Sequence, residues 1–74
     1  MKFTMAEAQD TLAANLRTIR NTQNLTIQDV SLRMGWDGGM IGDYEECKFS
    51  PSLRILLRLS DALEVPFSQL IEGL

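Results

Sequence analysis

The chain has no histidine and a single cysteine, Cys47, among its 74 residues. One cysteine excludes an internal disulfide, and one thiol without histidine cannot complete a zinc site, so we expect no bound metal and no other cofactor. An inert thiol is the main interpretation of Cys47, and a redox sensor or an intermolecular disulfide is the alternative. No apolar run reaches the roughly 18 residues that cross a bilayer, and the first ten residues lack the apolar core of a signal peptide. We therefore expect a cytoplasmic protein.

Catalytic groups are scarce as well. The sequence offers no activated nucleophile pair and no phosphate-binding loop, and its ten carboxylates fall on predicted helix surfaces and caps, so we do not expect an enzyme. The net charge of −3 is unfavourable for nucleic acid, whose binding depends on lysine and arginine. A chain of 74 residues with 45% hydrophobic residues is one globular domain near the lower size limit for independent folding.

Apolar residues recur at helical spacing along the chain, and no alternating strand pattern occurs. A first helix is predicted from about Thr4, which has capping-box spacing to Glu7, to the polar residues at 21–24. A second helix is predicted from Thr26 to Gly35, because glycine adopts the positive φ of a helix end without steric cost.

A third, short helix is predicted from Asp37 to about Glu46, with Trp36, Ile41 and Tyr44 facing inward. Three glycines destabilise this helix by about 3 kcal/mol relative to alanine, so its stability must come from tertiary packing.

A fourth helix is predicted to begin at Ser50-Pro51, because serine caps well and proline suits the first helical position. Pro66 separates it from a short fifth helix over residues 67–71. The predicted inward stripe of the fourth helix is Leu53, Leu56, Leu57 and Leu63. The sequence therefore predicts an all-α fold, a compact bundle of five helices in one domain over residues 1–74.

Four consecutive segments resemble the lambda-repressor-like helix-turn-helix domain of the Cro/repressor (xenobiotic response element, XRE) family. They are LRTIR, NLTIQDVSLRMG, DYEECKFSPS and LRILLRLSDALEVPFSQLI. The resemblance covers about residues 12–71, and residues 1–11 extend the first helix at its N-terminal end. It implies a central helix-turn-helix and a sequence-specific transcriptional regulator that binds double-stranded DNA as a homodimer.

The resemblance also implies site residues. A structural ion pair is expected between Arg20, late in the first helix, and Glu45, at the end of the third. The recognition-helix positions that reach bases in this family fall on Gly38, Gly39, Met40, Gly42 and Asp43. The candidate phosphate contacts are Thr26, Gln28, Lys48, Arg17 and Arg54. Ser31 takes the place of the small residue at which the two motif helices meet.

The recognition positions lack the arginine, lysine, asparagine and glutamine that read bases best. Between Thr26 and Cys47 the chain has one basic and five acidic residues, which gives this segment a charge of −4. Cys47 and Glu64 stand where the family commonly has glycine, so the turn at Cys47 is expected to be strained or reshaped.

Three interpretations remain open. In the first, the chain is a DNA-binding regulator that reads DNA shape more than bases. In the second, it is a protein-binding helix-turn-helix module that has lost direct base readout and acts as a partner or antagonist of another regulator. In the third, the outer face of the third helix is merely solvated. The resemblance favours DNA, whereas the residues alone favour a protein partner at the acidic, glycine-rich third helix. The apolar residues near the C-terminus either close the core or form a dimer contact: Val65, Phe67, Leu70, Ile71 and Leu74.

Overall fold

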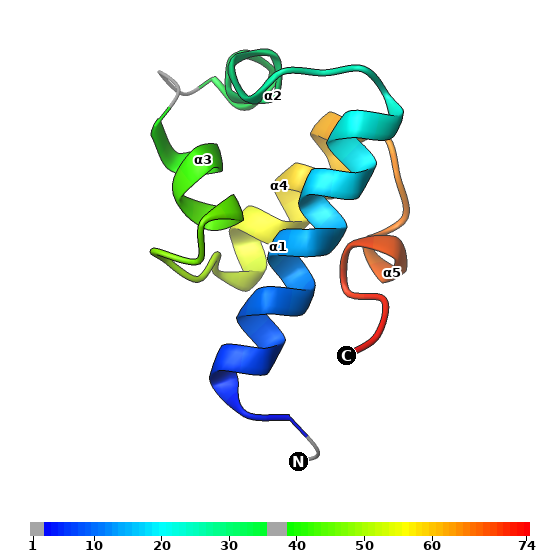
Figure 1. Cartoon of the computed structure of the whole chain (residues 1–74). Helices are drawn as coiled ribbons and strands as arrows, with labels where there is room; N and C mark the ends of the chain where they lie inside the picture. The colour runs from blue at the N-terminus through cyan, green and yellow to red at the C-terminus, as the bar shows by residue number, and fades with distance from the viewer. Residues whose placement is uncertain (1–2, 36–38) are drawn as a thin grey trace.

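The computed structural model describes residues 3–35 and 39–74, and within these ranges it contains five α-helices and no strand. The helices are α1 (Met5–Thr22), α2 (Ile27–Met34), α3 (Gly39–Glu45), α4 (Leu53–Leu63) and α5 (Phe67–Leu70). The long helix α1 runs through the molecule, with α3 and α5 on opposite sides of it (Figure 1). The all-α prediction is confirmed. No helix in the described ranges has the length and hydropathy required to span a membrane.

The first two helices begin at the predicted residues, each with a reciprocal capping box. The Thr4 hydroxyl accepts from the Glu7 backbone N–H at 3.1 Å, and the Glu7 carboxylate accepts from the Thr4 N–H at 3.0 Å. Thr26 and Asp29 repeat the arrangement at 3.0 and 2.9 Å. Because these hydrogen bonds favour the ionised carboxylate, with the backbone N–H of each threonine contributing most, they lower the pKa of Glu7 and of Asp29.

The fourth helix begins two residues later than predicted. Its cap is Ser52, whose hydroxyl accepts from the Ile55 backbone N–H at 3.2 Å. The Ser50 hydroxyl instead accepts a hydrogen bond from the Gln9 side chain on α1. Pro51 therefore precedes the cap and does not occupy the first helical position. The prediction for the fifth helix agrees with α5 to within one residue.

The predicted inward stripe of α4 was partly wrong. Leu53 and Leu57 are 64% and 50% exposed, whereas Leu59 and Leu63 are fully buried. Ile55 and Leu56 pack against the core from the same side as Leu59, because residues three or four positions apart lie on one face of a helix. Leu53 and Leu57 lie on the neighbouring face, which meets solvent.

All five helices contribute to one apolar core. Its buried members are Leu16, Ile19, Val30, Met34, Ile41, Tyr44, Leu59, Leu63 and Leu70. Ile41 and Tyr44 hold α3 in place, as predicted for a helix that depends on packing. Trp36 and Asp37, also predicted to belong to this helix, lie outside the described residues.

Residues in the left-handed backbone conformation end α2 and α4, and another lies in the turn after α3. Gly35 ends α2 at φ +77°, as predicted. Cys47, after α3, and Glu64, after α4, have φ values of +61° and +56°. The chain therefore keeps a turn geometry that suits glycine while placing L-residues in it, which costs steric strain. The expected strain at Cys47 is present in its backbone angles.

Candidate nucleic-acid interface

The second and third helices pack against each other, and each contributes buried side chains. Ser31 on α2 is 1% exposed, and Ile41 on α3 is fully buried. A Cβ added at Gly42 would lie 3.9 Å from Cδ1 of Ile27, an ordinary van der Waals distance. Gly42 is therefore close to α2, yet the packing there does not require glycine.

The outer side of α3 presents few groups that could read bases. Met40 is 41% exposed, and Gly42 and Asp43 are partly exposed. Gly39 is the first residue of α3, and Gly38 lies outside the described residues. Asp43 and Met40 thus supply the functional side chains at the described recognition positions.

A bidentate ion pair fixes the C-terminal end of α3 to α1. Nε of Arg20 donates to Oε2 of Glu45 at 2.7 Å, and Nη2 donates to Oε1 at 3.0 Å. The third donor group, Nη1, is bound to the Leu25 carbonyl at 2.8 Å. Hydrogen bonding to Glu45 raises the pKa of Arg20, and both side chains are largely buried. This pair is the one implied by the resemblance, and its role in the described structure is to orient α3.

Two candidate phosphate-binding cations also face carboxylates of the chain itself. Nη2 of Arg17 donates to the Glu45 backbone carbonyl at 2.9 Å, and its Nε lies 3.5 Å from a carboxylate oxygen of Glu45. The Lys48 ammonium lies 3.9 Å from the Glu46 carboxylate. Half or more of each of these cationic side chains is exposed, so both remain accessible to an approaching anion.

The remaining phosphate candidates lie at helix starts. Thr26 and Gln28 are exposed at the N-terminal end of α2, where backbone N–H groups also favour anions. Arg54 is exposed in the first turn of α4, and its side chain makes no hydrogen bond or ion pair with the described residues. The candidate cations therefore lie in the second half of α1, in the turn after α3 and in the first turn of α4.

Two arginines that the sequence analysis did not single out join α2 to α4. Arg33 donates to the Ala62 carbonyl at 3.0 Å, and Arg58 donates to the Met34 carbonyl at 2.8 Å. Each guanidinium thus satisfies a carbonyl in the last turn of the opposite helix. Periodicity alone could place both residues only on a solvated helix face.

The apolar residues near the C-terminus, predicted either to close the core or to form a dimer contact, differ in burial. Leu70 is 1% exposed and closes the core. Val65 packs against the core, and Phe67 and Ile71 are partly buried. Leu74, at 44% exposure, is the one exposed member of the predicted set.

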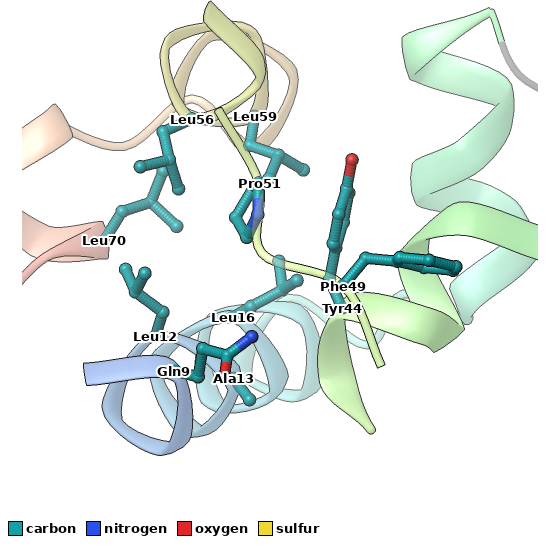
Figure 2. Close-up of a pocket in the computed structure, with 10 residues that line it drawn as sticks. All are labelled: Gln9, Leu12, Ala13, Leu16, Tyr44, Phe49, Pro51, Leu56, Leu59 and Leu70. Atoms are coloured by element: carbon teal, nitrogen blue, oxygen red, sulfur yellow. The ribbon is translucent and has the colours of Figure 1, made fainter. Parts of the chain in front are cut away.

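A small apolar hollow lies between α1 and α4 (Figure 2). Leu12, Tyr44, Phe49, Pro51 and Leu56 are among the residues that line it. Its volume of about 10 Å³ accommodates at most about one water molecule. The hollow is therefore too small to be a ligand pocket.

The chain is similar to known proteins both in sequence and in fold. A family model described as helix-turn-helix matches residues 16–70. None of the curated proteins compared matches the chain. The crystal structure of a hypothetical transcription factor, NHTF, from Neisseria superposes with a TM-score of 0.84. The superposition covers 93% of this chain and 79% of that one at 20% sequence identity, so it shows a shared fold.

Proposed function

The chain belongs to the helix-turn-helix family, and from this premise we propose that it is a transcriptional regulator that binds duplex DNA as a dimer. In helix-turn-helix proteins the second motif helix lies in the major groove. The observation that carries the proposal is the bidentate Arg20–Glu45 pair, which fixes α3 as a rigid element against α1. The similar fold of a protein described as a hypothetical transcription factor supports it.

Direct base readout by this chain is limited. Within α3, Asp43 can accept from a cytosine amino group and Met40 can contact a thymine methyl. The other recognition positions are glycines, which let the backbone approach the groove closely. Recognition therefore depends on phosphate contacts and on DNA shape, to which Arg17 and Lys48 contribute as cations.

Selection from a random duplex library at low salt tests this proposal. Enrichment of a two-fold symmetric site would support a dimeric DNA reader, and its half-site spacing would give the separation of the two α3 helices. Absence of enrichment by protein that circular dichroism shows to be folded would contradict DNA binding.

A protein-binding module is the second candidate. The observation that favours it is the acidic outer side of α3 and the turn that follows, where Asp43 is partly exposed and Glu46 is exposed. In this case the acidic α3 surface contacts a basic partner protein. A partner whose binding is lost in Asp43→Lys, in a chain that enriches no DNA site, would establish this alternative.

A further inference from the structure

The outer side of α4 combines apolar and charged residues in a regular pattern. Leu53 and Leu57 are exposed one helical turn apart, and Arg54 and Asp61 are exposed beside them. Arg54 and Asp61 are separated by seven residues, about two turns, and so share one edge of the leucine pair. Neither side chain makes a hydrogen bond or ion pair with the described residues. We name these four residues the α4 face.

We propose that the α4 face binds the α4 face of a second copy, with the two helices antiparallel about a two-fold axis near Leu57. This two-fold axis places the same edge of the two helices side by side and reverses their direction. A residue near the start of one helix therefore faces a residue near the end of the other. Arg54 of each copy then lies opposite Asp61 of the other. Two reciprocal ion pairs flank a seam formed by Leu53 and Leu57.

The charges identify the occupant as a second copy. A partner surface of one sign would attract only one of the two charges, whereas this edge carries both signs at matched positions and is complementary to itself. Apolar residues at i and i+4 with flanking opposite charges are also the pattern of paired helices.

The proposed contact is small. The 11 residues of α4 span about 16 Å, so the seam falls at the low end of the size of specific interfaces. Association is therefore weak and depends on protein concentration. The inference rests on the proposed function, whose dimer contact it assigns to the α4 face. Because association is measured without DNA, a failure of this contact and a failure of DNA binding are distinguishable.

Charge reversal tests the pairing. In Arg54→Asp both edge positions are acidic, and in Asp61→Arg both are basic, so each variant alone should sediment as a monomer at concentrations where the wild type dimerises. An equimolar mixture should restore the dimer, because each acid of one variant then faces an arginine of the other. Sedimentation equilibrium measures all three samples, and circular dichroism verifies their folding.

Leucine variants supply the controls. Leu57→Asp should abolish the dimer, whereas Leu32→Asp, at a leucine 67% exposed on α2, should leave it unchanged. Leu74→Asp should also leave it unchanged, which separates the α4 face from a C-terminal contact. A wild-type protein that stays monomeric up to millimolar concentration would overturn the inference. Dimers of wild-type strength in either charge variant, or a mixture that remains monomeric, would overturn it too.

Discussion

Glu45 serves two arginines from one nearly buried position. Its carboxylate accepts both bonds from Arg20, and its backbone carbonyl accepts from Arg17. Glu45→Gln leaves the Arg20 charge without its partner in a largely buried site, so the free energy of unfolding should fall by about 3 kcal/mol. Urea denaturation measures the loss. Glu46→Gln, at an exposed neighbour with a 3.9 Å contact to Lys48, should change it by less than about 0.5 kcal/mol.

Ser31 illustrates the opposite case, a polar atom without a partner. Its hydroxyl oxygen on α2 is buried and makes no hydrogen bond with the residues that the structure describes. Ser31→Ala removes an unsatisfied group from the core, so we expect stability to rise by about 1 kcal/mol. Thermal unfolding checks this. Ser31→Val should destabilise the fold, because added methyl groups overpack the contact. A loss of stability in the alanine variant would show that the hydroxyl has a partner in solution.

At the scale of the helix, α4 ends with an unfavourable residue. Glu64 adopts left-handed angles that cost an L-residue about 1–2 kcal/mol. Glu64→Gly relieves this strain but increases the entropy of the unfolded chain, so we expect a net gain of about 1 kcal/mol. Glu64→Ala keeps the strain and should give no such gain. Equal stability of the two variants in urea would mean that α4 does not end in this conformation.

The capping boxes of α1 and α2 predict how stability depends on pH. Both carboxylates have a pKa below their ordinary values of 4.5 for Glu7 and 3.8 for Asp29. A lowered folded-state pKa gives stability that is complete above the ordinary value and is lost as pH falls through the lowered one. Stability should therefore decline below about pH 4.5. Asp29→Asn should flatten this decline, whereas Glu72→Gln, outside both caps, should preserve it in urea titrations at each pH.

The elements also show what the sequence could specify. The starts of α1 and α2 were predictable because each capping box is complete within four residues. The start of α4 was not, because Ser50 and Ser52 both suit a cap, and the choice depends on Gln9, which lies far away in sequence. The α2–α4 contacts of Arg33 and Arg58 were missed for the same reason, since backbone carbonyls leave no signal in the sequence.

At the scale of the whole molecule, the position of a charge matters more than the net value of −3. Asp43→Gln and Glu72→Gln both change the net charge to −2, but only Asp43 lies on α3. If α3 faces DNA, Asp43→Gln should strengthen binding to duplex DNA at low salt, and Glu72→Gln should have a smaller effect. Fluorescence anisotropy with a labelled duplex compares them. Equal affinities would place α3 away from the phosphates.

The side-chain caps of α1, α2 and α4 also bear on how fast the chain folds. Each cap joins residues three apart, so it can form within a single helical turn before any distant segment arrives. Helix formation of this local kind takes about a microsecond or less. The slow events are then the long closures, the longest of which bring the Leu70 and Glu72 carbonyls to Asn15 on α1 across 55 and 57 residues. A helical protein with this order of contacts should fold within milliseconds, and the contacts between α1 and the C-terminal residues should form after the caps.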